Sequence, residues 1–219
     1  MKKTAIITAM REEAEHIIKN YSLTQTKIIS NIEFYENSEI VLVLVWIGKI
    51  QAAIWTTMLF ENYKFEKLVN IWIVWNLAWS KQMIWDVFLV NKISQHDMYL
   101  PFDWAHLDYA KKPIIIENSL EINKDFWNFK VINNAYCLTW DQFIDDENKV
   151  LELYNTYNAN ICEMEAFAVA SVARIYNFTN LVFIKAISDG ADNTSKDDHM
   201  NNLDFAMKNS IIVLEEILK

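Results

Sequence analysis

Runs of apolar, β-branched residues alternate along the chain with segments whose apolar positions recur every three or four residues. Short apolar runs between polar or turn-forming residues are typical of strands, and the three-to-four periodicity is typical of helices. The pattern predicts strands at residues 4–9, 27–35, 39–47, 68–74, 87–93, 130–138 and 181–187. It predicts helices at residues 11–21, 49–63, 146–157, 164–176 and about 203–218.

This alternation of strands and helices favours the α/β class. The predicted strands are apolar on both faces, which favours a sheet covered on both sides. We expect one domain spanning residues 1–219, with ligand sites at the ends of the strands. Residues 95–113 carry no clear period, and a long ordered loop of this kind is often functional.

The composition narrows the partners that we expect. The 219 residues are 53% hydrophobic and carry a formal charge of -9 without a basic cluster, which argues against nucleic acid and favours a small-molecule ligand. No apolar stretch approaches the roughly 20 residues of a membrane helix, and the apolar run at residues 4–10 is too short for a signal core. Cys137 and Cys162 lack metal-ligand or disulfide spacing. We expect a cytoplasmic protein without a metal, cofactor or membrane partner.

Glycine is rare in this chain and tryptophan is abundant. Average usage of about 7% would give roughly 15 glycines, yet the chain has 2 glycines and 9 tryptophans. Several tryptophans stand where a strand should run into a turn, as in the segment at residues 70–80 and at Trp85 and Trp140, each of which precedes an aspartate. At these positions a large tryptophan side chain stands where the backbone should turn.

Acidic residues gather at the predicted strand-to-helix transitions. Four segments carry them: Ala9-Met10-Arg11-Glu12-Glu13, Trp140-Asp141-Gln142-Phe143-Ile144, Glu163-Met164-Glu165-Ala166 and Ala186-Ile187-Ser188-Asp189-Gly190-Ala191-Asp192. Carboxylates at strand ends indicate acid/base chemistry. Taken singly, however, Glu12, Glu13 and Glu165 can equally be first-turn acids that favour the helix dipole, and Asp189 can be a capping or turn residue.

Taken in order, these segments resemble the methylthioadenosine/S-adenosylhomocysteine nucleosidases of the purine nucleoside phosphorylase superfamily. The likeness spans nearly the whole chain and also includes Trp46-Ile47-Gly48-Lys49, the segment at residues 70–75 and His96-Asp97. It implies a phosphorylase/hydrolase-like fold, a single-domain three-layer αβα architecture with a central mixed, twisted sheet. It also implies a homodimer in which the loop near Phe102 completes a neighbour's pocket.

The resemblance assigns the two catalytic roles to Glu13 and Asp189. Glu13, the third residue after Met10, looks like the acid that activates the attacking water, and Glu12 is then only its neighbour. Asp189 looks like the acid that hands a proton to purine N7, with Ser188 orienting it. A neutral purine leaves far more readily than its anion, and such proton transfer is worth roughly 100-fold to 10,000-fold in rate.

The resemblance also places the substrate. Glu165 resembles the carboxylate that accepts hydrogen bonds from the ribose hydroxyls, and Met164 would line the sugar. Phe143 would stack on the purine while the backbone of Ile144 reads its edge. Met10 and Ile47 would lie toward the 5′ substituent. For Phe143, Ile47 and Met10, plain core packing is the alternative interpretation.

Two residues depart from the family pattern near the ribose and the water. Lys185 stands where the family usually has arginine, and Ile73 where it has a small polar residue; lysine keeps the charge but loses the planar fork. Phosphorolysis generally needs an arginine and glycine-rich phosphate cradle, yet the only arginines are Arg11 and Arg174. The sequence therefore favours hydrolysis over phosphorolysis, although Lys49 and Lys185 leave the phosphorylase alternative open.

A third alternative is a non-catalytic nucleoside-binding homologue in which tryptophan side chains block the pocket. Five tryptophans, at positions 46, 72, 75, 85 and 140, align with family positions that are normally glycine. An L-residue at positive φ costs about 1–2 kcal/mol and overpacking about 1–3 kcal/mol per site, against a total stability of about 5–15 kcal/mol. We therefore hypothesise that a codon such as UGA, which different genetic codes read as tryptophan or glycine, has been assigned the wrong residue.

Overall fold

The fold of the chain is taken from a computed structural model. It describes residues 1–219 except 1–2, 30–31, 79–81, 118–119, 145 and 190–194, and describes only the backbone of 195–200. In chain order the elements are β1 (Lys3–Thr8), α1 (Arg11–Tyr21), β2 (Thr24–Ile29), β3 (Ile32–Glu36), β4 (Ile40–Leu44), α2 (Lys49–Asn62), β5 (Phe65–Asn76), β6 (Val87–Gln95), a 3₁₀ helix (Ala105–Leu107), α3 (Asp108–Lys111), β7 (Ile114–Ile115), β8 (Val131–Thr139), α4 (Glu147–Tyr157), β9 (Ile161–Glu163), α5 (Ala166–Ile175), β10 (Leu181–Asp189) and α6 (Ser195–Leu218).

The strands form one mixed sheet in the order β10-β6-β8-β9-β5-β1-β4-β3-β2. β1, β4, β5 and β10 run parallel in adjacent pairs, so their carboxyl ends meet at one edge of the sheet. β10 also pairs with β6, and the short β9 joins β8 to the end of β5. The pairings β5-β10-β6-β8-β9-β5 thus close a circuit of five strands, whose mouth includes the carboxyl end of β5.

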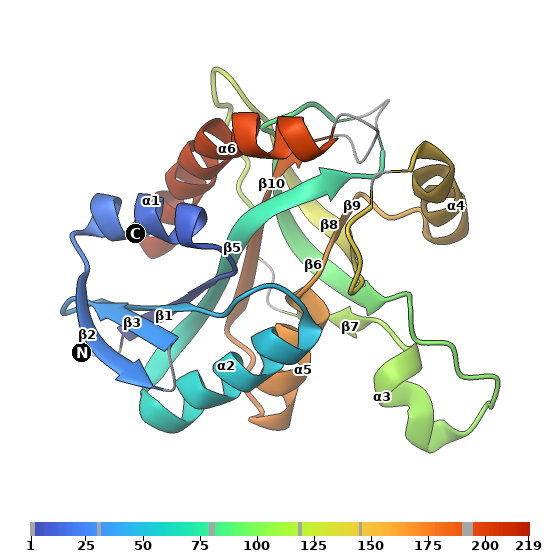
Figure 1. Ribbon diagram of the computed structural model, residues 1–219, viewed down its shortest axis with the longest axis horizontal. Helices are drawn as coiled ribbons and strands as arrows, with labels where there is room; N and C mark the ends of the chain where they lie inside the picture. The colour runs from blue at the N-terminus through green and yellow to red at the C-terminus, as the bar shows by residue number, and fades with distance from the viewer. Residues whose placement is uncertain (1–2, 30–31, 79–81, 118–119, 145, 190–194) are drawn as a thin grey trace.

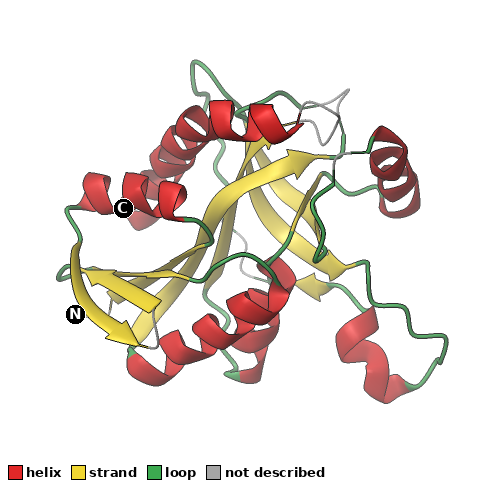
Figure 2. Ribbon diagram, in the orientation of Figure 1, coloured by secondary structure: helices red, strands yellow, loops and turns green. Residues whose placement is uncertain are grey.

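Helices cover both faces of this sheet, as the apolar pattern predicts. Figures 1 and 2 show α1 and α6 on one side and α2 and α5 on the other. Alternate residues of β5 point to opposite faces of the sheet and pack in two separate apolar cores. Trp72 and Val74 pack in the core that includes α2 and α5, whereas Ile71 and Ile73 pack in the core that includes α1 and α6. The three-layer αβα class predicted from the sequence is confirmed.

The structure differs from the sequence prediction in several details. The strand expected at residues 27–35 is two antiparallel strands, β2 and β3, because the chain reverses between them. The aperiodic loop at 95–113 contains the 3₁₀ helix and α3. The three-residue β9 was not predicted, because its segment is too short to carry a period.

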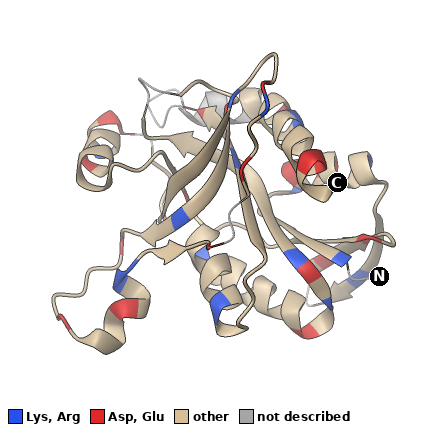
Figure 3. Cartoon of the chain, turned by 180° about the vertical axis from the view of Figure 1, so that it is seen from behind, with Lys and Arg blue, Asp and Glu red and all other residues tan. Residues whose placement is uncertain are grey.

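The surface of the molecule mixes charges of both signs. Seen from behind in Figure 3, basic and acidic positions are interspersed over the helices and strand edges. Within the described residues, no helix is both long enough and apolar enough to span a bilayer.

Two tryptophans have a backbone conformation that L-residues rarely adopt. Trp46 has φ 62° and Trp85 has φ 77°. Trp46 follows β4 and leaves 53% of its surface exposed, so its ring gains little burial in return for the strained backbone. Glycine adopts positive φ without this cost.

Replacing Trp46 by glycine should therefore stabilise the protein. The left-handed conformation costs an L-residue about 1–2 kcal/mol. Glycine removes this cost, but its greater freedom in the unfolded chain offsets part of the gain. We expect a net gain of about 1 kcal/mol, which corresponds to a rise of about 3 °C in Tm, measured by thermal unfolding. Trp127→Gly is the control, because Trp127 is fully exposed and has no positive φ. A Tm that falls in Trp46→Gly would contradict the strain argument.

Candidate active site

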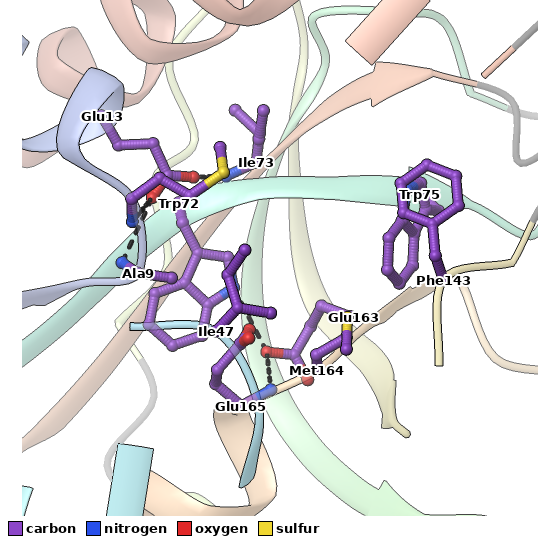
Figure 4. Close-up of a pocket in the computed structure, with 11 residues that line it drawn as sticks. Ala9, Glu13, Ile47, Trp72, Ile73, Trp75, Phe143, Glu163, Met164 and Glu165 are labelled. Carbon is purple, nitrogen blue, oxygen red and sulfur yellow. Dashed lines mark hydrogen bonds between the residues drawn. The ribbon is translucent and has the colours of Figure 1, made fainter. Parts of the chain in front are cut away.

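A cavity of about 150 Å³ opens beside the carboxyl ends of β1, β4 and β5. Eleven residues line it: Ala9, Met10, Glu13, Ile47, Trp72, Ile73, Trp75, Phe143, Glu163, Met164 and Glu165 (Figure 4). They come from the segments that follow β1 and β4, from β5, from the loop after β8, and from β9 and its continuation into α5. The structure thus brings together six of the ten residues that the sequence nominates.

Glu13 is a buried carboxylate in the first turn of α1. Its Oε2 accepts hydrogen bonds from Thr8 Oγ1 at 2.9 Å, Met10 N at 2.9 Å and Ala9 N at 3.2 Å. Its Oε1 accepts from Ile73 N at 3.1 Å. Glu13 is thus an acid of the first turn of α1, as the plainer interpretation predicts, and its side chain also caps the helix and joins β1 to β5 at the wall of the cavity.

The surroundings of Glu13 suit a general base. Burial raises its pKa, and the hydrogen bonds from Ile73, Met10 and Thr8, together with the charge of Lys185, oppose part of that rise. A carboxyl whose pKa is moved toward neutrality is a better proton acceptor than an ordinary glutamate. The neighbouring Glu12 is exposed. Of the two acids, only Glu13 lines the cavity.

Glu163 is a buried acid that the sequence argument overlooked. It ends β9, and its Oε1 accepts from Thr139 Oγ1 at 2.6 Å. Its Oε2 accepts from Ala166 N at 2.7 Å, Glu165 N at 3.0 Å and Trp72 Nε1 at 3.2 Å. Glu163 thereby fixes the start of α5, which begins directly after Glu165. The signal available in the sequence was the position of Glu163 between apolar residues and the start of a predicted helix.

Glu165 faces the cavity next to the loop that follows β4. Its Oε1 accepts a hydrogen bond from Gly48 N at 2.7 Å. Burial, followed by the charge of Glu163, raises the pKa of Glu165 to about 8, although the Gly48 hydrogen bond and Lys185 oppose the rise. With this pKa, Glu165 holds its proton at neutral pH.

This proton makes stability depend on pH with a defined sign. Between the ordinary value of 4.5 and the folded pKa of about 8, Glu165 holds its proton in the folded protein and loses it on unfolding. The folded state then binds more protons, so stability falls as the pH rises through this window, by up to about 1.4 kcal/mol per pH unit.

Urea unfolding between pH 5 and pH 9 should show this fall in the parent protein and a shallower fall in Glu165→Gln. Glu12→Gln is the control, because Glu12 is exposed on α1 and should leave the parent slope unchanged. Parallel pH profiles for the parent and Glu165→Gln would show that Glu165 does not carry the proton.

Lys185 lies on β10 opposite Trp72 of β5 and is fully buried. Its Nζ donates to Asn70 Oδ1 at 2.5 Å, lies 3.5 Å from Glu163 Oε2 and stands 3.2 Å from the centroid of the Trp72 ring. Burial lowers the pKa of Lys185, whereas Glu163, Cys137, Glu165 and Glu13 raise it. Lys185 thus lies behind Trp72 and does not line the cavity.

Asp189 and Ser188 end β10 and are both fully buried. Ser188 Oγ donates to Asp189 Oδ2 at 2.7 Å, the orientation that the sequence argument expects. Asp189 pairs in register with Trp75 of β5, which lines the cavity, whereas Asp189 itself does not line it. Ala191 and Asp192, which complete the sequence motif, lie outside the described residues, as does Trp79.

The apolar residues nominated from the sequence divide into two groups. Met10, Ile47, Phe143 and Met164 line the cavity, and Ile47 and Phe143 are partly exposed at its edge. Ile144 is buried in a small core cluster around α4 and does not line the cavity. The ring of Phe143 contacts Trp75 edge to face, with 4.7 Å between centroids.

A second polar cluster ties three loops together at the side of the site. Lys49 Nζ donates to Asp97 Oδ1 at 2.6 Å, and Lys49 N donates to Asp141 Oδ1 at 2.8 Å. The neighbouring His96 packs edge to face on Trp140, and burial lowers its pKa to about 4. Asp97 thus holds the loops after β4, β6 and β8, in keeping with a structural role for the His96-Asp97 pair.

Comparison with known proteins places the chain among nucleoside-processing enzymes. Residues 3–219 match the phosphorylase superfamily. The chain is 29% identical over 99% of both chains to a 5′-methylthioadenosine/S-adenosylhomocysteine nucleosidase of Shewanella loihica. The structure resembles such a nucleosidase from Neisseria meningitidis (TM-score 0.83, 21% identity, 100% and 99% coverage). It also resembles the futalosine hydrolase of Helicobacter pylori (TM-score 0.83, 20% identity, 99% and 97% coverage).

Proposed function

This chain belongs to the phosphorylase superfamily, and we propose that it hydrolyses the N-glycosidic bond of adenine nucleosides of the 5′-methylthioadenosine and S-adenosylhomocysteine type. The observation that carries the proposal is the gathering of Glu13, Glu163 and Glu165 around one small cavity. Residues 1–219 would act as one nucleosidase domain without a cofactor, on a nucleoside substrate.

The carboxylates suit a reaction in which positive charge grows on the sugar. As the bond between the base and C1′ breaks, the ribosyl group becomes cationic, and buried carboxylates facing that position stabilise it. One buried amine, Lys185, accompanies the three acids. The site therefore complements a cationic transition state better than a neutral substrate.

Two residues would move protons in this reaction. Asp189 protonates N7 of the leaving purine, so that adenine departs as a neutral base when the glycosidic bond breaks. Glu13 takes a proton from the water whose oxygen forms the new bond to C1′. Atoms balance as nucleoside plus water giving adenine plus the free sugar, with Glu165 binding the ribose hydroxyls, Met164 lining the sugar and Phe143 stacking on the base.

The positions of the cations favour water over phosphate as the attacking group. Arg11 pairs with Glu33 on the surface, and Arg174 is exposed at the end of α5, where it donates to Tyr109 O. Lys49 is engaged by Asp97 and Asp141, and Lys185 lies behind Trp72. A phosphate cradle needs converging cations and backbone donors, and none of these four cations lines the cavity.

A phosphate-controlled assay tests the proposed reaction. The chain as printed and a form with glycine at all nine tryptophan positions, here called the all-glycine form, are incubated with 5′-methylthioadenosine, and released adenine is quantified by chromatography. We expect adenine release without phosphate and a rate that added phosphate leaves unchanged. Release that strictly requires phosphate would select a phosphorylase, and binding without release in either form would select a non-catalytic homologue.

We also propose that the chain acts as a homodimer. The loop before α3 exposes apolar side chains, among them Tyr99, Phe102 and Trp104, and the rings of Phe102 and Trp104 stack 4.7 Å apart. Exposed clusters of this kind mark interaction sites. In a homodimer, this loop would lie over the neighbour's pocket.

A further inference from the structure

Two tryptophans of β5 occupy the cavity that the substrate would need. Trp72 is 1% exposed, and its ring lies between Lys185 Nζ and the cavity, with its Nε1 bonded to Glu163. Trp75 is 5% exposed and contacts Phe143, the residue that would stack on the purine. Figure 4 shows Trp72 near Ile47 and the acidic residues, and Trp75 beside Phe143.

The space that remains is small for a nucleoside. The cavity measures about 150 Å³, whereas pockets for small-molecule ligands usually hold about 300–1,000 Å³. Both indoles line the cavity, Trp72 on the side of the acidic residues and Trp75 beside Phe143. Removing the two rings would therefore enlarge the cavity.

Trp75 also has an unpaired polar group. Its Nε1 is buried and has no hydrogen-bond partner among the described residues. A buried donor without a partner is costly, and native structures rarely keep one. Together with the positive φ of Trp46 and Trp85, this places strained or unsatisfied tryptophans at three positions where glycine would be free of the defect.

We propose that Trp72 and Trp75 form a plug that closes the nucleoside pocket, and that the functional protein carries glycine at these two positions. The inference rests on the proposed function for the identity of the ligand. In the chain as printed, the Trp75 ring packs against Phe143; with glycine at position 75, Phe143 is free to face the substrate. Positions 72 and 75 therefore decide whether the pocket admits a nucleoside.

Peptide sequencing tests the residue identities directly. Trypsin cleavage after Lys67 and Lys81 yields one peptide, residues 68–81, that contains both positions. Tandem mass spectrometry of this peptide, from protein made in its own host, should read glycine at 72 and 75. Tryptophan at both positions would overturn the assignment of glycine to the functional protein.

Ligand binding tests the plug independently of catalysis. Calorimetry with 5′-methylthioadenosine is run on the parent, on Trp72→Gly/Trp75→Gly and on the control Trp127→Gly, whose exposed ring lies outside the cavity. We expect the double variant to bind at least about 100-fold more tightly than the parent and the control, because each ring must otherwise be displaced from a packed site. Circular dichroism and thermal unfolding verify that each variant is folded.

The outcomes separate this inference from the proposed reaction. Tighter binding by the double variant without adenine release supports the plug and contradicts the nucleosidase function. Equal, tight binding by the parent and the double variant overturns the plug and leaves the function standing. If the folded double variant and the folded all-glycine form both fail to bind the nucleoside, the plug is overturned, since opening the pocket then admits no ligand.

Discussion

Asp189→Asn should lower the rate of adenine release by about 100-fold to 10,000-fold, the range that a positioned general acid contributes. Asparagine keeps the size of the buried aspartate and can still accept the hydrogen bond from Ser188 Oγ. It has no ionisable proton to give to N7, so the purine would have to leave as an anion. Initial rates with 5′-methylthioadenosine are compared in whichever form of the chain releases adenine.

A substrate with a better leaving group distinguishes proton donation from a structural role. A nitrophenyl riboside expels a stabilised phenolate and needs no proton at the departing atom. Asp189→Asn should therefore cleave it at nearly the parent rate. If the variant loses both reactions equally, Asp189 shapes the site and does not act as the acid. The rate of adenine release by Ser188→Ala should lie between the rates of the parent and of Asp189→Asn, because this change removes only the group that orients Asp189.

Much of the fold could be predicted because burial repeats along the strands and helices. The helix at residues 11–21 has the predicted bounds, and the ends of β6, β8 and β10 lie within two residues of their predicted positions. Period and composition are local properties, so they survive in a single sequence. The closing of the circuit by β9 is not local. It depends on a three-residue strand, two residues of which pair with the distant end of β5.

The candidate site was predictable to the extent that its residues stand at strand ends. Glu13 follows β1, Glu165 follows β9, and Asp189 ends β10. Ligand-binding sites of α/β proteins lie at such strand ends. Glu163 was missed because the sequence does not reveal which acid of Glu163-Met-Glu165 turns inward to cap α5 and pair with Lys185. The position of Lys185 behind Trp72 follows from strand register, which single-sequence patterns do not specify.

The buried acidic side chains of the site outnumber its buried amine. Three acids share one amine, and their desolvation raises the pKa of Glu13 and Glu165. A buried charge without a partner is expensive, so the raised pKa values of Glu13 and Glu165 favour their protonated forms, and a nearby positive group would favour the ionised forms. A ribosyl cation would be such a group. The same cost of burying these acids would then favour the transition state of the proposed reaction.

Glu13→Gln should lower kcat by about 100-fold to 10,000-fold and leave KM close to the parent value. Glutamine cannot take a proton from water, and binding of the nucleoside does not depend on that transfer. The pH profile adds a second signature. A base with a raised pKa is inactive when protonated, so the parent rate should fall on the acid side of that pKa, and Glu13→Gln should lack this limb.

The cap that Glu13 forms must be separated from its role as a base. The carboxylate accepts from Thr8, Ala9, Met10 and Ile73, and a glutamine amide group would turn a donor toward at least one of these donors. We therefore also expect a loss of about 1–3 kcal/mol in unfolding free energy, which urea unfolding measures. Glu12→Gln, exposed on the same turn, should change neither quantity. If Glu13→Gln loses stability while the folded protein keeps its kcat and its acid limb, Glu13 is a helix cap alone, and another group must activate the water.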